Sequence, residues 1–266
     1  RIPSNAFDNN NYLKKIEFAE NSELESIGKY ALTYTSVEEI LFPDHVTKID
    51  YSSCNCCHNL KNVHLPNNPN YQVIDSMIFY ESSISTINIS PFIHTINEGA
   101  FYRCYCLKTI NFPDDSKLKY IKSIAFSESE IEKIGIPSHV ISLGDCVFKG
   151  CKKLKKVYFL LNSEIKTIGK FAFKKSSIER LSIPSSIQRF EKGCFSLTNN
   201  LIRIKVFNNR EKNIIYYDDK FIIGKSDLKS DNYDILYFSR RDIETAIIPS
   251  FIKRIASNAF ERCYNL

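Results

Sequence analysis

Nine cysteines and five histidines are the side chains of this sequence best suited to metal or redox chemistry. One segment concentrates them, with Cys54, Cys56, Cys57 and His58 almost adjacent and His64 a short distance beyond. Zinc favours thiolate and imidazole ligands, but its sites commonly draw them from paired elements such as Cys-x-x-Cys. The spacing Cys-x-Cys-Cys-His contains no such pair, and we therefore predict neither a metal site nor a cofactor.

The sequence motifs of common enzyme classes are absent or incomplete. Gly224-Lys225-Ser226 resembles the end of a phosphate-binding loop, but Asp219 stands where that loop requires a glycine. Neither Gly-x-Ser-x-Gly nor His-Glu-x-x-His occurs. His45 and His139 are 94 residues apart, twice a spacing of 47 residues that other residue types share. These observations predict that the protein is not an enzyme.

A small residue followed by a bulky one recurs along the whole chain. The interval between successive pairs alternates between 25 and 22 residues as far as Cys194, so the repeating unit is a double coil of 47 residues. The pairs are Ala6-Phe7, Ala31-Leu32, Ser53-Cys54, Ile78-Phe79, Ala100-Phe101, Ala125-Phe126, Val147-Phe148, Ala172-Phe173, Cys194-Phe195 and Ala259-Phe260.

Apolar residues follow each pair at steps of three and two, as in Val37, Ile40 and Phe42. The last two flank one outward residue, which is the period of a β-strand. A single coil cannot bury such a triplet, whereas stacked coils cover one another. We predict one solenoid domain over residues 1–266, β-rich, with a parallel strand in each of about 11 coils of 22 or 25 residues, and few short helices.

The cysteines fall on this lattice. Cys57, Cys104 and Cys151 are 47 residues apart, and Cys263 takes the same place after Ala259-Phe260. Alternate coils lie about 10 Å apart, whereas a disulfide needs Cα atoms within about 7 Å. We therefore expect buried thiols that pack as small apolar side chains.

The pattern breaks once, over residues 207–242, which we interpret as an irregular, hairpin-like insertion. Residues 214–223 and 235–238 are strand-like, residues 224–233 have the composition of an exposed loop, and the repeats resume at Ile247-Ile248-Pro249. Both ends of the sequence fall inside a repeat and neither carries a polar capping coil. We expect a fragment of a longer protein, with ends that can associate end to end.

Charge on the predicted strand face is uneven. Among the outward positions of successive coils, one column is basic through its second half and a neighbouring column adds an aromatic and a lysine. We predict that this part of the face binds an acidic protein or glycan; the alternative is a solvated face neutralised by Glu132 and Glu179. The candidate partner-binding residues are Lys133, Lys156, Tyr158, Arg180, Arg203 and Lys205.

The net charge of +6 is small for a dedicated nucleic-acid binder of 266 residues, so we expect no nucleic acid among its partners. No uncharged apolar run reaches the roughly 18 residues of a membrane helix, so we expect no membrane insertion by this stretch of chain.

The repeat resembles the BspA-type leucine-rich repeat. The likeness rests on Ala100-Phe101 with Cys104 three residues on, on Ile134-Gly135-Ile136-Pro137, and on the segment Ile168–Phe173. Arrays of this type resemble those on surface proteins of bacteria and parasitic protists, where they bind host proteins or other cells. The resemblance implies a non-enzymatic adhesion or protein-interaction module at the cell surface or outside the cell. A cytoplasmic scaffold or regulatory repeat protein is the alternative.

Overall fold

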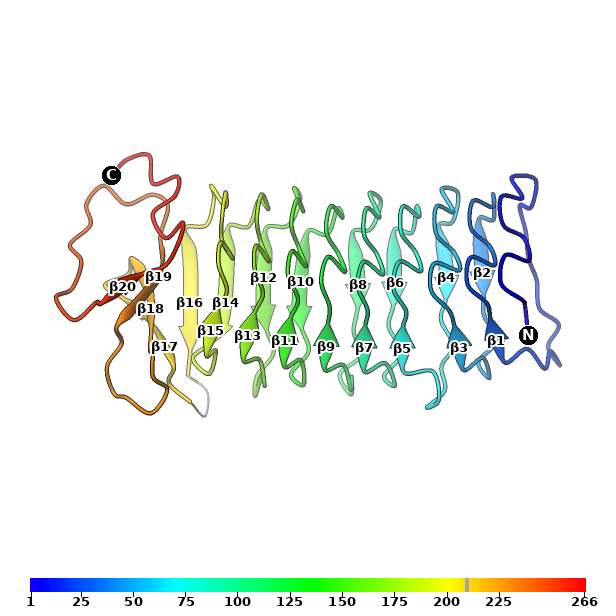
Figure 1. Cartoon of the computed structure of the whole chain (residues 1–266), viewed down its shortest axis with the longest axis horizontal. Helices are drawn as coiled ribbons and strands as arrows, with labels where there is room; N and C mark the ends of the chain where they lie inside the picture. Colours follow the sequence, from blue (N-terminus) through cyan, green and yellow to red (C-terminus); the bar gives the residue numbers. More distant parts are fainter. Residues whose placement is uncertain (209–210) are drawn as a thin grey trace. The chain divides into compact units, whose positions relative to one another are not determined.

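The structure is a computed structural model that describes residues 1–208 and 211–266. It forms two compact units, residues 1–132 and 133–266. Both are built of stacked coils whose strands run parallel (Figure 1). The predicted parallel solenoid is confirmed, with about 10 turns beside the expected 11.

From Ser26 onward, the coils of the first unit carry two kinds of strand. The longer strands form the surface that we call the first face, where β2 (Glu39–Leu41) pairs with β4 (Asn62–His64) and β6 (Thr86–Asn88) with β8 (Thr109–Asn111). The two-residue strands form the second face: β1 (Ser26–Ile27), β3 (Lys48–Ile49), β5 (Val73–Ile74), β7 (Thr95–Ile96) and β9 (Tyr120–Ile121).

The second unit repeats this arrangement up to its insertion. Its first face is a ladder of β10 (Lys133–Ile136), β12 (Lys156–Phe159), β14 (Arg180–Pro184) and β16 (Arg203–Phe207). Its second face holds β11 (Ser142–Leu143), β13 (Thr167–Ile168) and β15 (Arg189–Phe190). The prediction of one strand per coil missed the second face, because a two-residue strand is too short to show alternation in the sequence.

The apolar triplets fill the interior as predicted. On β2, Ile40 is fully buried while Leu41, the outward residue beside it, is 58% exposed. The bulky members of the small-bulky pairs stack from coil to coil, and the rings of Phe173 and Phe195 lie 5.7 Å apart and nearly parallel. A continuous apolar core therefore runs through each unit, made by contacts between neighbouring coils.

The prediction of few short helices is wrong, since the described residues contain only strands and turns. The reason lies in the backbone of the small-bulky segments, where residues with a positive φ recur four apart, a conformation that a right-handed helix cannot contain. These left-handed pairs follow the repeat: Asn5 and Asn9, Tyr30 and Tyr34, Ser52 and Cys56, Met77 and Glu81, Gly99 and Arg103, Ile124 and Glu128, Cys146 and Gly150, Phe171 and Lys175, Gly193 and Leu197, Asn258 and Arg262.

Replacement of Lys175 by glycine is expected to stabilise the protein. Lys175 is exposed and has a φ of 58°, where a side chain costs roughly 1–2 kcal/mol that glycine avoids. After the greater backbone entropy of glycine is subtracted, the free energy of unfolding should rise by about 0.5 kcal/mol. Urea denaturation measures this change. The matched substitution Lys152→Gly, at an exposed turn residue outside the positive-φ set, should instead lower stability, and equal effects would contradict the explanation.

The insertion contains three antiparallel strands, one more than the sequence suggested. The segment 214–223 divides into β17 (Ile214–Tyr217) and β18 (Phe221–Gly224), and β18 also pairs with β19 (Ile235–Ser239). Asp218 and Asp219 both have a φ of 51° and turn the chain between β17 and β18. Consecutive left-handed residues are typical of tight hairpin turns, which is why the apolar run does not continue as one strand.

The coil after the insertion resumes later than predicted. Ile247-Ile248-Pro249 forms no strand, and Ile247 is 82% exposed. The chain after β16 forms antiparallel strands instead of a regular coil. Ile247-Ile248-Pro249 therefore has no parallel strand of a preceding coil to pair with. Regular stacking returns at β20 (Arg254–Ile255), which pairs in parallel with β19. A small separate core of Phe221, Ile223, Leu236, Ile243 and Ala259 holds the insertion and this last coil together.

Candidate functional site

The four predicted cations of the second unit form one line across its first face. Lys133 is in register with Lys156, Lys156 with Arg180, and Arg180 with Arg203. Parallel strands are about 4.8 Å apart, and all four side chains are exposed. The structure therefore aligns residues as far apart in the sequence as Lys133 and Arg203, which are separated by 70 positions. We call this line the basic column.

Tyr158 and Lys205 lie in the adjacent column of the same face. Gly135 is in register with Tyr158, and Ser182 with Lys205. The ammonium group of Lys156 lies 5.0 Å from the centre of the Tyr158 ring. A Cβ at position 135 would come within 2.7 Å of Cζ of Tyr158. The absence of a side chain at Gly135 thus leaves room for the tyrosine ring to lie flat on the face.

A hollow of about 410 Å³ opens beside the column. Its walls include Lys156, Arg180, Arg203 and Lys205 from the first face, and Asp219 and Arg240 from the insertion. Asp219 does not neutralise the column, because its carboxylate Oδ2 is 2.9 Å from Nη1 of Arg240. The place of Arg240 could not be predicted from the sequence, because an irregular insertion has no repeat from which to place its residues.

The cations of the column lack acidic partners. Within residues 1–208 and 211–266, no ion pair joins Lys156, Arg180 or Arg203 to a carboxylate, and Glu179 forms none with them. Neighbouring charges at strand spacing repel by about 1 kcal/mol in water. An anion that lay along the column would relieve this repulsion.

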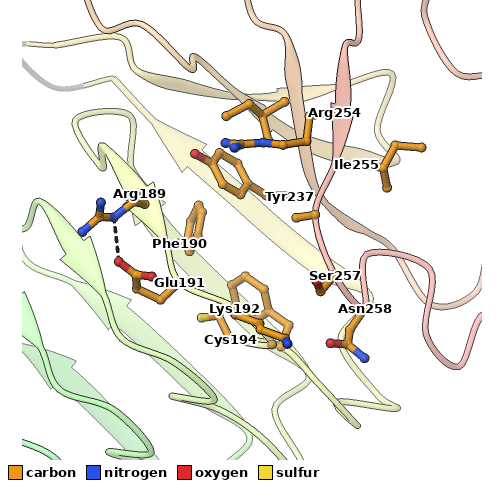
Figure 2. A pocket seen from close by; sticks show the side chains of 14 residues that line it. Arg189, Phe190, Glu191, Lys192, Cys194, Tyr237, Arg254, Ile255, Ser257 and Asn258 are labelled. Atoms are coloured by element: carbon orange, nitrogen blue, oxygen red, sulfur yellow. Dashed lines mark ion pairs between the residues drawn. The ribbon is translucent and has the colours of Figure 1, made fainter.

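A second cavity, of about 310 Å³, lies between the second face and the coil after the insertion (Figure 2). Tyr237 and Arg254 come from β19 and β20, and the Phe190 ring contacts that of Tyr237 at 5.2 Å. Arg189 at its edge is already paired with Glu191, with Nε 2.7 Å from Oε1 (Figure 2).

The residues that resemble catalytic motifs have structural partners. Ser226, from the sequence that resembles a phosphate-binding loop, donates its hydroxyl and backbone N–H to the carboxylate of Asp234 at 2.6 and 2.8 Å. A loop that binds a carboxylate of its own chain in this way does not present these groups to a phosphate. His139 is exposed, with Nδ1 2.9 Å from Oε1 of Glu164.

The lattice cysteines Cys57 and Cys104 pack as predicted. Both are fully buried, and their thiols donate to the carbonyls of Leu32 and Phe79, each at 3.0 Å. Burial raises the pKa of Cys57 to about 11 and that of Cys104 to about 12. The two side chains are therefore neutral thiols with no nucleophilic character at neutral pH.

The described residues contain no helix of the length and apolar character that crossing a bilayer requires. Residues 1–108, 119–230 and 226–266 match, in 6 copies, the family described as the BspA type leucine-rich repeat region. No curated protein sequence matches the chain.

Several solved structures share the fold. The pneumococcal vaccine antigen PcpA is 26% identical with a TM-score of 0.63, and the match covers 71% of this chain and 47% of PcpA. This chain therefore spans about half the length of that antigen. A leucine-rich repeat protein from Bacteroides ovatus is 20% identical with a TM-score of 0.67, covering 100% of this chain and 68% of that one. A leucine-rich cell surface protein from Faecalibacterium prausnitzii is 22% identical with a TM-score of 0.63, covering 94% and 59%.

Proposed function

This chain belongs to the BspA-type leucine-rich repeat family, and from that premise we propose that it is a non-enzymatic recognition module at a cell surface. The likeness to PcpA, a vaccine antigen, and to a protein described as a cell surface protein supports this location. The family supports a role in protein interaction. The surface and the chemistry of the partner come from the residues of this chain.

The partner that fits best is an acidic protein segment or acidic glycan bound along the first face of the second unit. The observation that carries this proposal is the basic column, in which exposed cations stand in register on consecutive strands and form no ion pair with a carboxylate among the residues that the structure describes. Tyr158 adds a flat aromatic surface beside Lys156. An extended polyanion can contact several strands at once, since the cations recur at the strand spacing of about 4.8 Å.

Reversal of Lys156, Arg180 and Arg203 to glutamate is expected to abolish polyanion binding. Each cation contributes about 1 kcal/mol at an exposed site, so loss of all three weakens binding by at least about 100-fold. Titration calorimetry with heparin and with poly-glutamate measures the effect and also distinguishes a glycan from a peptide partner. Affinity of the unmodified protein should fall steeply as salt rises, because exposed charges are screened.

A control variant with the same change in net charge distinguishes the effect of the basic column from the effect of the protein's overall charge. Lys152, Lys153 and Lys170 are exposed residues outside the basic column, and their reversal to glutamate should leave most of the affinity intact. Equal losses in both triple variants would show that only net charge matters. Failure of the unmodified protein to bind either polyanion would contradict the proposed partner chemistry. Antibody labelling of intact source cells tests the surface location, and labelling only after permeabilisation would favour the cytoplasmic scaffold.

A further inference from the structure

Three side chains of types that can bind metals lie close together in turns of the first unit. The thiol of Cys56, a ring nitrogen of His58 and a carboxylate oxygen of Glu81 all lie within 4.8 Å of one another. Cys56 is buried, Glu81 is half-buried and His58 is exposed, so the cluster opens to solvent on one side. The cluster belongs to the first unit and the basic column to the second, and they share no residue.

The repeat explains why these residues meet. Cys56 and Glu81 are the second left-handed residues of consecutive coils, with φ of 54° and 55°. The two coils are joined here by a hydrogen bond from the Cys56 N–H to the Tyr80 carbonyl at 2.7 Å. The stacking therefore places the Cys56 thiol 4.0 Å from Oε2 of Glu81. The hydrogen bond between the two coils therefore sets the separation of the two side chains.

His58 is held in an orientation that suits a metal ligand. Its Nδ1 lies 3.1 Å from the backbone carbonyl of Glu81. A carbonyl only accepts hydrogen bonds, so Nδ1 carries the proton of the neutral ring and Nε2 keeps the lone pair. Metal-binding histidines commonly donate their second ring N–H to such a carbonyl, which fixes the tautomer.

The Glu81 carboxylate is also fixed and ionised. The Tyr80 hydroxyl donates to Oε1 at 2.7 Å and Nη1 of Arg103 lies 3.2 Å from the same oxygen. Burial raises the pKa of Glu81, but these two donors outweigh it and the net shift is downward. Both occupy Oε1, which leaves Oε2, the oxygen nearest Cys56, for another partner.

We propose that Cys56, His58 and Glu81 form a zinc site that links two consecutive coils, with water as a fourth ligand. Thiolate, imidazole and carboxylate together suit Zn²⁺ better than Mg²⁺ or Ca²⁺, which prefer oxygen ligands alone. The segment around Cys54 predicts no site by its own spacing, because the third ligand, Glu81, is on the next coil. Burial raises the pKa of the Cys56 thiol, so zinc must displace one proton from sulfur to solvent.

Cobalt(II) is the probe that tests this site in the full chain under reducing conditions. We expect a thiolate-to-cobalt charge-transfer band that saturates at about one equivalent and disappears when Zn²⁺ is added. Cys56→Ser should abolish the band, and His58→Ala and Glu81→Gln should each weaken binding by about 100-fold, because losing a direct ligand costs at least as much as losing a residue that only orients one. Calorimetry in buffers of different ionisation enthalpy should show release of about one proton.

The exposed thiol of Cys106 provides the matched control. Cys106→Ser should leave the band and the affinity unchanged, and circular dichroism should show that every variant keeps its strands. No thiolate band in the unmodified protein would overturn the proposal. So would a band that survives in Cys56→Ser and is lost in Cys106→Ser, because cobalt would then bind elsewhere.

Discussion

Replacement of Arg241 by alanine is expected to lower the free energy of unfolding of the second unit by about 3–5 kcal/mol, because it removes several hydrogen bonds from a charged donor, each contributing about 1.5–3 kcal/mol. Arg241 is only 4% exposed. Its guanidinium donates to the carbonyls of Ala259 at 2.9 Å, Phe195 at 3.1 Å and Thr198 at 3.4 Å. Alanine would leave the Thr198 carbonyl without a donor, at about 1–3 kcal/mol. The carbonyls of Phe195 and Ala259 would keep hydrogen bonds from Thr198 and Ser239 and lose only the contact with the charged group.

The position of Arg241 explains the size of this effect. The guanidinium joins the coil that holds Phe195 to the coil that holds Ala259, across the insertion that interrupts regular stacking. It also lies 4.3 Å from the centre of the Phe238 ring. Burial lowers the pKa of Arg241, yet an arginine keeps its charge. The Arg241 side chain thus adds contacts between these coils to the hydrogen bond from the Leu197 N–H to the Glu261 carboxylate.

Two further variants test this explanation. Arg241→Lys should recover only part of the stability, because an ammonium group cannot reach three carbonyls in the fixed geometry of a guanidinium. Arg240→Ala removes exposed ion pairs with Asp219 and Asp242 and should cost about 1 kcal/mol or less. Amide hydrogen exchange of residues 235–260 reports the local stability. Equal protection in Arg241→Ala and Arg240→Ala would show that Arg241 does not hold these coils together.

The sequence predicted the parts of the fold that repeat. Inward residues such as Ile40, the lattice cysteines and the line of cations all follow from the spacing of 22 and 25 residues. Stacking translates that spacing directly into distance, so residues at the same place in successive coils become neighbours. The register Lys156↔Arg180 is a direct consequence of this rule. What the basic column binds does not follow from spacing and stays a prediction.

The sequence did not predict features that depend on backbone conformation or on contacts off the lattice. The positive φ of Tyr30 or Lys175 leaves no mark in residue type, since neither is glycine or asparagine. The turn at Asp218 and Asp219 divided an apolar run that reads as a single strand. Arg241 reads as one more charge in a polar segment, and only the structure shows that it is buried. Glu81 joins Cys56 because both occupy the left-handed position, which the sequence does not reveal.

Replacement of Phe173 by alanine is the second change with a large expected effect, about 3–5 kcal/mol of unfolding free energy. The Phe173 side chain is fully buried. Its ring stacks on Phe148 and on Phe195, each at 5.7 Å, with interplanar angles of 9° and 7°. Removal of the ring therefore weakens the contacts of one coil with both of its neighbours, and the stability of a solenoid resides in such contacts.

The loss of stability should affect the coils around Phe173 before the whole unit unfolds. If coil contacts add up along the array, Phe173→Ala should broaden the urea transition or split it into two, whereas Phe173→Leu should shift one transition by about 1–2 kcal/mol. Phe251→Ala, at a ring that is 43% exposed, should change stability by less than about 1 kcal/mol. Phe101 in the first unit stacks on Phe79 and Phe126 at 5.4 and 5.5 Å, so Phe101→Ala should cost as much as Phe173→Ala. A small loss at both positions would mean that the backbone ladders, and not the stacked rings, stabilise the coils.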